Sequence, residues 1–357
     1  MLVALWSWCL AASTEGNLVI DGIPAIPAEV VERTGQYNNV RSATLSGWKP
    51  DGSGVLISTR FGETSQAHFV AGPGADRQQL TFYDEPIAGA SFDPFGTGQS
   101  ILLSRDAAGA EKWQYYRFDI ATGLTTLLTD GTSQNEGAIW SQGGGQIAFS
   151  STRRNKRDYD IYVMDVNKPD SAKLVLEVNG KWSPVDWAPG NQQILLQEYV
   201  SITESRLHLL NLADASVVEL NPTETAIGYS AVMFGQTANT VFWASDEGSD
   251  FTRLISYDVT TRVQTPVSSV AWDIEGVSRS LDRKQIAYSV NEGGISALYT
   301  APIAKPTQAK RIDLPQGVLS SYIFDPSGKR LAYSISTAQT TSDVYVVDLK
   351  KNKTDRW

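Results

Sequence analysis

The side chains of this sequence that could do chemistry are charged residues in short polar segments. Five arginines and glutamates stand where such a segment separates two apolar stretches: Arg105, Glu111, Arg153, Arg154 and Glu204. A guanidinium group binds a carboxylate through paired hydrogen bonds, and a carboxylate binds an ammonium group. If the fold brings these segments to one opening, the five residues are candidates for contact with the charged end of a peptide. Ordinary solvated turns, rich in Asp, Ser and Asn, remain the alternative for each segment.

No catalytic or metal-binding motif accompanies these residues. The serine elbow Gly-x-Ser-x-Gly is missing, because residues 89–93 and 276–280 lack its final glycine. The phosphate-binding loop and His-Glu-x-x-His are missing as well. Cys9 is the only cysteine, which excludes an intramolecular disulfide and a cysteine-rich metal site. The two histidines, His68 and His208, are expected to be partly buried strand residues. We therefore expect no catalytic residue, no metal and no cofactor.

An internal repeat predicts the elements that carry the polar segments. Each copy begins with an anchor residue, usually aromatic, and a Gly, Pro or Asp turn, followed by a short apolar strand. The anchors are Trp48, Phe92, Trp140, Trp187, Phe234, Arg279 and Phe324, spaced by 44, 48, 47, 47, 45 and 45 residues. Arg279 replaces the aromatic residue in the sixth copy. A period of about 46 residues is typical of a four-stranded propeller blade.

The pattern within one copy predicts antiparallel strands. Residues 147–150 and 331–334 are apolar or small throughout, so both faces of these strands should be buried. Residues 160–165 are β-branched or aromatic between two aspartates, which is typical of a further strand. A solenoid is the competing architecture, but four strands in each copy without a helical stretch favour radial closure. We predict an all-β fold, a seven-bladed β-propeller of four-stranded antiparallel blades with PD40/WD-like repeats, over residues 43–357.

The N-terminal residues do not share the repeat. Residues 17–42 are predicted to form a short N-terminal arm, with a helix that begins near Pro27 because proline suits the first helical turn. Residues 1–16 are interpreted as a leader segment with an apolar stretch and small residues near position 13, although no Lys or Arg precedes it. Two locations stay open: periplasmic or secreted if residues 1–13 are a signal peptide, and cytoplasmic otherwise.

Composition excludes two classes of partner. The chain has 30 Lys and Arg against 39 Asp and Glu, a formal net charge of −9. A protein that binds nucleic acid needs clustered basic residues, so we expect no nucleic-acid partner. No apolar run reaches the roughly 18 residues that cross a bilayer, so we expect no membrane span. With 41% hydrophobic and 19% charged residues, the chain can bury a large core.

Several phrases are more specific than the repeat. They are residues 18–27, 35–42, 56–62, Ser150-Ser-Thr-Arg-Arg-Asn155 with residues 160–165, and 245–249. Together they resemble the N-terminal propeller of prolyl-oligopeptidase-family serine peptidases, within the acylaminoacyl-peptidase and dipeptidyl-peptidase-like bacterial branch. The resemblance covers residues 17–357. The blade motif by itself is also shared with the propeller of the periplasmic Tol-system protein.

The resemblance implies a role in peptide hydrolysis without catalytic residues in this chain. In that family an α/β-hydrolase domain follows the propeller and carries the Ser, Asp and His triad, none of which is present here. The propeller would cover the hydrolase site, admit short peptides and exclude folded proteins, and its unpaired interface would expose an apolar patch. The expected partners are thus an α/β-hydrolase domain and short peptides. A stand-alone periplasmic propeller that binds a protein partner is the alternative. A propeller enzyme that acts through its channel, such as a lactonase or glycosidase, comes last.

Overall fold

The computed structural model describes residues 13–15, 18–268 and 270–357, in two units that divide between Arg41 and Ser42. In the first unit, β1 (Ser13–Glu15) pairs antiparallel with β2 (Leu18–Ile20), and α1 spans Ala28–Asn38. Pro27 is the N-cap of α1, so the helix predicted near Pro27 is confirmed. Most of the predicted leader, residues 1–12 and 16, lies outside the described residues. Among those described, no helix is long and apolar enough to cross a membrane.

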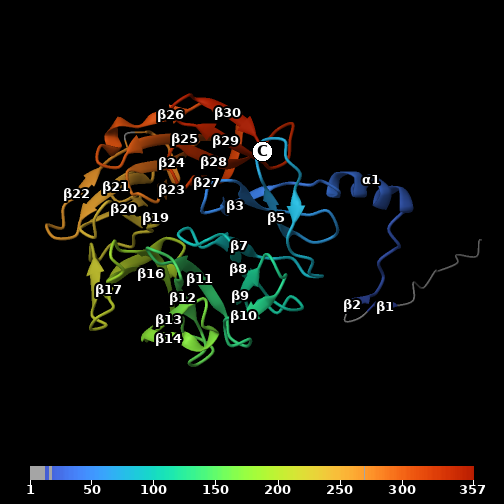
Figure 1. Cartoon of the computed structure of the whole chain (residues 1–357), viewed down its shortest axis with the longest axis horizontal. Coiled ribbons are helices and arrows are strands. Elements are labelled where there is room, and N and C mark those ends of the chain that lie inside the picture. The colour runs from blue at the N-terminus through green and yellow to red at the C-terminus, as the bar shows by residue number, and fades with distance from the viewer. Residues whose placement is uncertain (1–12, 16–17, 269) are drawn as a thin grey trace, which may run out of the picture. The chain divides into compact units, whose positions relative to one another are not determined.

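The second unit consists of seven four-stranded antiparallel sheets arranged around a common centre (Figure 1). Blade 1 contains β3 (Thr44–Trp48), β4 (Val55–Thr59), β5 (Gln66–Val70) and β6 (Gln78–Gln79), and blade 2 contains β7 (Gly89–Phe92), β8 (Ser100–Arg105), β9 (Gln114–Asp119) and β10 (Thr125–Leu127). Blade 3 contains β11 (Asn135–Trp140), β12 (Gln146–Ser151), β13 (Asp160–Asp165) and β14 (Lys173–Leu176), with the 3-10 helix η1 (Pro169–Ser171) between the last two. Blade 4 contains β15 (Lys181–Trp187), β16 (Gln193–Ser201), β17 (Glu204–Asn211) and β18 (Val217–Leu220), and blade 5 contains β19 (Ser230–Phe234), β20 (Thr240–Ser245), β21 (Arg253–Asp258) and β22 (Gln264–Pro266). Blade 6 contains β23 (Asp273–Arg279), β24 (Gln285–Glu292), β25 (Ile295–Pro302), the 3-10 helix η2 (Pro306–Gln308) and β26 (Lys310–Ile312), and blade 7 contains β27 (Gly317–Phe324), β28 (Arg330–Thr337), β29 (Asp343–Asp348) and β30 (Lys353–Arg356). The predicted seven-bladed β-propeller is confirmed.

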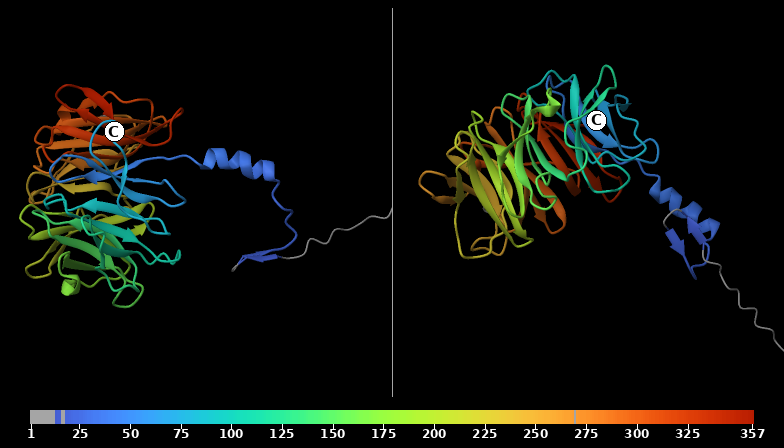
Figure 2. Two further views of the ribbon diagram at one scale, coloured as in Figure 1. Left: turned by 45° about the vertical axis from the view of Figure 1, so that its right-hand side comes forward. Right: turned by 90° about the horizontal axis from the view of Figure 1, so that it is seen from below.

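The strand order defines two faces of the propeller. Within each blade the strands pair in the order of the sequence, so successive strands run in opposite directions between the faces (Figure 2). The links from second to third strands and from one blade to the next therefore lie on one face, which we call the loop face. The turns from first to second and from third to fourth strands lie on the other, which we call the turn face. Each of the seven anchors predicted from the repeat is the last residue of a first strand, at the turn face.

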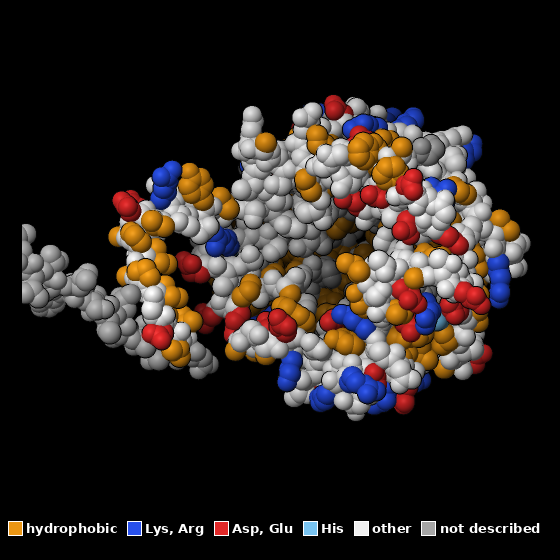
Figure 3. Space-filling view, turned by 180° about the vertical axis from the view of Figure 1, so that it is seen from behind, with side chains coloured by type: hydrophobic (Ala, Val, Ile, Leu, Met, Phe, Trp, Pro, Cys, Tyr) orange, Lys and Arg blue, Asp and Glu red, His pale blue; other side chains and the backbone are white. Residues whose placement is uncertain are grey.

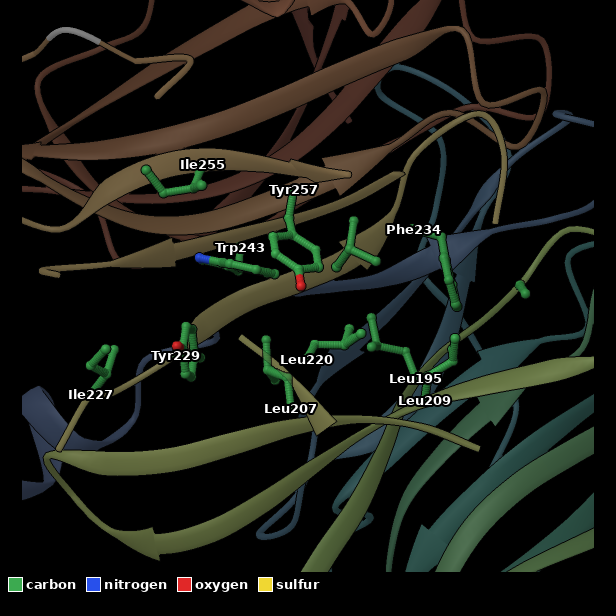
Figure 4. Close-up of a cluster of buried hydrophobic side chains, with 12 residues drawn as sticks. Leu195, Leu207, Leu209, Leu220, Ile227, Tyr229, Phe234, Trp243, Ile255 and Tyr257 are labelled. Atoms are coloured by element: carbon green, nitrogen blue, oxygen red, sulfur yellow. The ribbon is translucent and has the colours of Figure 1, made fainter. Parts of the chain in front are cut away.

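The core lies between neighbouring blades. The second strands are buried on both sides, as in β12, where Ile147, Ala148 and Phe149 have no exposed surface. Figure 4 shows one interface, where Trp243 of blade 5 packs between Tyr229 and Tyr257 with ring centres 5.4 and 4.7 Å away. Leucines of blade 4 cover the other side of this cluster. Alternate residues of one strand thus pack against the preceding and the following blade.

The ring closes between blades 7 and 1 without a shared strand. All four strands of blade 7 come from residues after 316, so the joint depends on packing and on single hydrogen bonds. The Leu45 amide donates to Ser334 Oγ (2.6 Å), and the Ala43 amide to the Ser342 carbonyl (2.7 Å). Trp357 packs edge to face on Trp48, with ring centres 5.3 Å apart.

Candidate functional site

Tryptophan anchors tie neighbouring blades together at the turn face. The indole N–H of an anchor donates to the residue that precedes the anchor of the blade before it. The three pairs are Trp48 Nε1 to the Ile323 carbonyl (3.0 Å), Trp187 Nε1 to the Ile139 carbonyl (3.2 Å) and Trp140 Nε1 to Ser91 Oγ (3.0 Å). A tryptophan anchor therefore contributes a hydrogen bond to the neighbouring blade as well as buried apolar area.

Arg279 performs the same task in blade 6 and adds an ion pair. Its Nη1 donates to the Phe234 carbonyl of blade 5 and lies 2.6 Å from Asp186 Oδ2 of blade 4. Its Nη2 lies 3.2 Å from Asp186 Oδ1, and the same carboxylate accepts the Phe234 N–H (2.8 Å). Both charged side chains are mostly buried, with 13% and 14% of their surface exposed. The exception in the repeat thus joins three blades.

Arg283 follows in the turn after β23 and joins the same three blades. Its backbone is left-handed, with φ of 58°, and its side chain is buried. Its Nη1 donates to the Gly235 carbonyl and its Nη2 to the Trp187 carbonyl, both at 2.9 Å. Burial, together with the nearby charge of Arg279, lowers the pKa of Arg283 to about 10. Nothing in the repeat pattern predicted this residue, because its contacts lie one and two blades away.

The centre of the turn face contains a small cavity of about 160 Å³. Its lining comes from blades 1, 2, 3, 6 and 7: Ser46, Gly47, Trp48, Pro50, Ser91, Phe92, Pro94, Trp140, Leu281, Ile323, Phe324 and Pro326. Pockets that hold drug-sized ligands usually measure about 300–1,000 Å³. The cavity is therefore too small to hold such a ligand.

The loop face carries most of the exposed apolar side chains. Among the described residues of the propeller, nine large apolar side chains more than a third exposed lie in the links or strand ends of this face, against five at the turn face. The nine are Phe61, Phe82, Leu127, Tyr199, Val200, Ile202, Trp272, Ile295 and Val318, and the five are Phe95, Leu124, Val217, Val218 and Val263. Ile202, at the tip of the β16–β17 hairpin, is 90% exposed. Figure 3 shows one propeller face with a hollow at its centre and acidic side chains gathered beside it.

Two of the five predicted contact residues lie at the loop-face link of blade 2: Arg105 ends β8, and Glu111 stands within the link. The Arg105 guanidinium lies 3.9 Å from the centre of the Tyr83 ring, and its Nη2 lies 3.5 Å from Glu85 Oε2. Within the described residues its buried Nε has no hydrogen-bond partner. Glu111 is exposed, and its backbone N–H donates to Asp106 Oδ2 (2.9 Å).

Arg153 and Arg154 lie next to each other in the loop-face link of blade 3 but differ in their contacts. Arg154 makes paired hydrogen bonds to Asp160, Nε to Oδ2 at 2.7 Å and Nη2 to Oδ1 at 2.8 Å. These bonds, with the nearby charge of the aspartate, raise the pKa of Arg154. Arg153 stacks 4.6 Å from the Tyr162 ring centre, and its buried Nη2 has no partner in the described part of the chain. Arg154 therefore holds its own loop, whereas Arg153 retains a free donor.

Glu204, the first residue of β17, belongs to a charged group on blade 4. It lies 2.9 Å from Arg206 Nη2, while Arg206 Nη1 lies 3.5 Å from Glu198. Glu198 is also 3.2 Å from Nε2 of His208, which stacks on Trp182 with ring centres 4.2 Å apart. All five predicted residues lie toward the loop face, on three successive blades. Among the described residues, no side-chain contact joins any two of the five.

A charged group at the loop-face end of the channel was missed by our sequence analysis. Lys181, which begins β15, lies 2.8 Å from Glu136 of β11, and Tyr159 OH donates to the same carboxylate at 3.4 Å. The contact with Glu136 raises the pKa of Lys181, and burial raises the pKa of Tyr159. Neither Lys181 nor Glu136 lies in a link between a second and a third strand, where the five candidates stand. The signal was a charged residue early in a first strand, where the side chain lies near the channel.

The two histidines are strand residues, as predicted. His68 lies in β5 and His208 in β17, the third strands of blades 1 and 4, and both are buried. His68 Nδ1 donates to the Gln66 carbonyl (3.0 Å), and burial lowers the pKa of each ring. Within the described ranges, no group of three or more His, Cys, Asp or Glu is arranged to hold a metal ion.

Solved structures share this fold at low sequence identity. A prolyl endopeptidase matches with a TM-score of 0.71 and 12% identity, over 89% of this chain and 49% of its own. A puromycin hydrolase matches with a TM-score of 0.68 and 10% identity, over 89% of this chain and 53% of its own. An oligogalacturonate lyase in complex with manganese matches with a TM-score of 0.69 and 12% identity, over 86% and 89% of the two chains. This chain thus spans about half the length of the prolyl endopeptidase.

The sequence comparison is more specific. No curated protein sequence matches this chain. Residues 137–342, more than half of the chain, match the family model of the dipeptidyl peptidase IV N-terminal region. The matched segment runs from β11 of blade 3 to the link before β29 of blade 7, so it lies entirely in the propeller. The chain therefore belongs to the family of the dipeptidyl peptidase IV N-terminal region, the propeller of prolyl-oligopeptidase-like proteins.

Proposed function

We propose that this propeller gates and selects peptide substrates for a prolyl-oligopeptidase-like serine peptidase. Peptide hydrolysis would be carried by an α/β-hydrolase domain docked on the loop face. The family match supports this role, and so does the coverage of about half of a prolyl endopeptidase chain. The observation that carries the proposal is the concentration of exposed apolar side chains on the loop face.

The topology of the propeller supports the same face as the docking surface. β3 starts at the loop face and β30 runs back toward it, so a domain joined before blade 1 or after blade 7 would be tethered on that side. Trp272 is 44% exposed and Ile202 is 90% exposed there. Apolar surface of this kind is unfavourable in water unless a partner covers it.

Two of the five predicted residues suit contact with a peptide carboxylate. Arg105 and Arg153 each have a buried N–H group without an acceptor in the described part of the chain, and each is held against an aromatic ring. A carboxylate would satisfy such a donor through a charge-assisted hydrogen bond. Arg154 is occupied by Asp160, so we assign it a positioning role in the same loop. Glu111 and Glu204 are the candidates for an ammonium group.

The first experiment is to read the coding sequence beyond codon 357 and express the continuous product. We expect a Gly-x-Ser-x-Gly segment, cleavage of short chromogenic peptides by the continuous product, no cleavage of folded proteins, and no cleavage by residues 1–357 alone. A downstream sequence without a hydrolase-like segment, with a protein partner captured instead, would favour the stand-alone binding propeller.

The second experiment tests the apolar face with residues 1–357. The triple variant Phe82→Ser, Ile202→Ser, Trp272→Ser should bind less of the apolar dye anilinonaphthalene sulfonate than the unchanged chain. The matched control Phe95→Ser, Leu124→Ser, Val263→Ser alters the turn face. Equal dye binding by the two triple variants would contradict the assignment of the loop face.

A further inference from the structure

Residues 279–283, the last residue of β23 and the turn that follows it, form a loop that contacts blades 4 and 5. Its two ends are arginines: Arg279 binds Asp186 of blade 4 and the Phe234 carbonyl of blade 5, and Arg283 binds the Trp187 and Gly235 carbonyls of the same blades. Because Arg283 is buried and its guanidinium bonds are short, this end of the loop has little freedom to move.

The middle of the same loop reaches the rest of the ring. Leu281 lines the turn-face cavity together with Trp140 of blade 3 and residues of blades 1, 2 and 7. Blade 6 stands three blades from blade 3 in a ring of seven, so Leu281 and Trp140 approach the cavity from nearly opposite sides. Gly328 of blade 7 packs under the loop, since a Cβ at that position would lie 3.3 Å from Ser280 Cβ. This five-residue segment thus contacts blades 4, 5 and 7 and lines a cavity together with residues of blades 1, 2, 3 and 7.

We infer that residues 279–283 form a plug that closes the central channel at the turn face. The two arginines hold the plug, and Leu281 fills its tip. The remaining cavity of about 160 Å³ admits a few water molecules, each of which occupies about 30 Å³ in the liquid, and no peptide. Peptides must therefore reach an enzyme docked on the loop face from that side or between blades. Only this last step rests on the proposed function, because the plug itself is a property of the propeller.

The plug also accounts for arginine in place of an aromatic anchor. An aromatic side chain at position 279 could fill the space between blades 5 and 6, as Phe234 does between blades 4 and 5. It could not reach the Asp186 carboxylate two blades away. In the sixth copy, Arg279 thus replaces the apolar contact of an aromatic anchor with polar contacts that fix the start of the loop.

Thiol labelling of the 357-residue chain tests the plug. In a Cys9→Ser background, Ser46→Cys places a thiol in the cavity, and Ala121→Cys places one on an exposed turn of the same face as a reference. We expect N-ethylmaleimide to modify Ser46→Cys at least about tenfold more slowly than Ala121→Cys, because thiol reactivity depends on access. Adding Leu281→Ala should accelerate the modification of Ser46→Cys about tenfold, and Leu281→Trp should slow it further.

Controls separate the plug from general loosening. Leu314→Ala removes a leucine of similar size from a different cavity, beside β26, and should leave the Ser46→Cys rate unchanged. Circular dichroism establishes that each variant is folded. The plug is refuted if Ser46→Cys reacts as fast as Ala121→Cys with the loop intact, or if Leu281→Ala and Leu281→Trp leave its rate unchanged. Neither result depends on a hydrolase domain, so the plug and the proposed function can fail independently.

Discussion

Replacing Asp186 with alanine should destabilise the propeller far more than the loss of a surface carboxylate. Its carboxylate accepts two contacts from Arg279, at 2.6 and 3.2 Å, and the Phe234 N–H at 2.8 Å. Removing one partner of a buried pair costs about 3–5 kcal/mol, and the residual exposure of 13% and 14% places this pair near 3 kcal/mol. At roughly 2 °C per kcal/mol for a large domain, the melting temperature should fall by about 6 °C.

The assay is thermal unfolding followed by tryptophan fluorescence, for Asp186→Ala, Arg279→Ala and the double variant. Because each single variant leaves a partner behind, the double variant should cost less than the sum of the two, by at least about 1 kcal/mol. Asp355→Ala is the matched control. It breaks an exposed pair with Lys353 (2.9 Å), and such pairs contribute about 0–1 kcal/mol. Additive single variants, or an Asp186→Ala shift no larger than that of Asp355→Ala, would refute the reasoning.

Three further predictions follow from single contacts. Trp48→Phe keeps an aromatic side chain, although a smaller one, and removes the N–H that donates to the Ile323 carbonyl where blades 7 and 1 meet (3.0 Å). It should lower the free energy of unfolding by about 1 kcal/mol in chemical denaturation, against about 3–5 kcal/mol for Trp48→Ala; equal losses would contradict this. Gly144 and Gly145 both have positive φ, but a Cβ at Gly144 would lie 2.3 Å from Asp93 Oδ1, whereas one at Gly145 would meet open space; Gly145→Ala should cost about 1–2 kcal/mol and Gly144→Ala clearly more, measured by melting temperature. Burial lowers the pKa of His68, so as the pH falls the unfolded chain takes up a proton before the folded chain does. The neutral buried His68 therefore contributes fully to the free energy of unfolding above the unfolded pKa of about 6.5, and this contribution is lost as the pH falls below that value. The urea concentration at the unfolding midpoint should therefore decrease as the pH is lowered below about 6.5, and His68→Gln should make this decrease smaller. An equal decrease in the variant and the unchanged chain would count against this role of His68.

The blade architecture could be predicted because its signal repeats. An anchor such as Trp187 recurs at nearly constant spacing, and all seven anchors end first strands at the same face. Buried second strands such as β12 require apolar residues on both sides, which is visible in any sequence window. The position of the five candidate residues toward the loop face follows from the same alternation of strands, although their role in peptide contact stays a prediction.

Other features depend on side-chain contacts that the repeat pattern does not predict. Arg154 and Arg153 are neighbours in the sequence, yet only Arg154 meets a carboxylate, because Asp160 lies opposite it in the hairpin. Lys181 of blade 4 and Glu136 of blade 3 pair between neighbouring blades, and neither lies in a link between a second and a third strand. In the same way, the sequence showed that Arg279 replaces an aromatic anchor but not which groups it contacts.

The sequence by itself determined the number of blades, the strands within each blade and the face on which each loop emerges. These depend on the period of the apolar pattern and on the alternation of strand direction, which are local properties of the chain. Only the tertiary structure decided which charged groups meet, and that residues 279–283 lie across the end of the channel. Closing a ring brings together residues about 45 or 90 positions apart, such as Arg279 with Phe234 and Asp186, and no window of the sequence contains both partners.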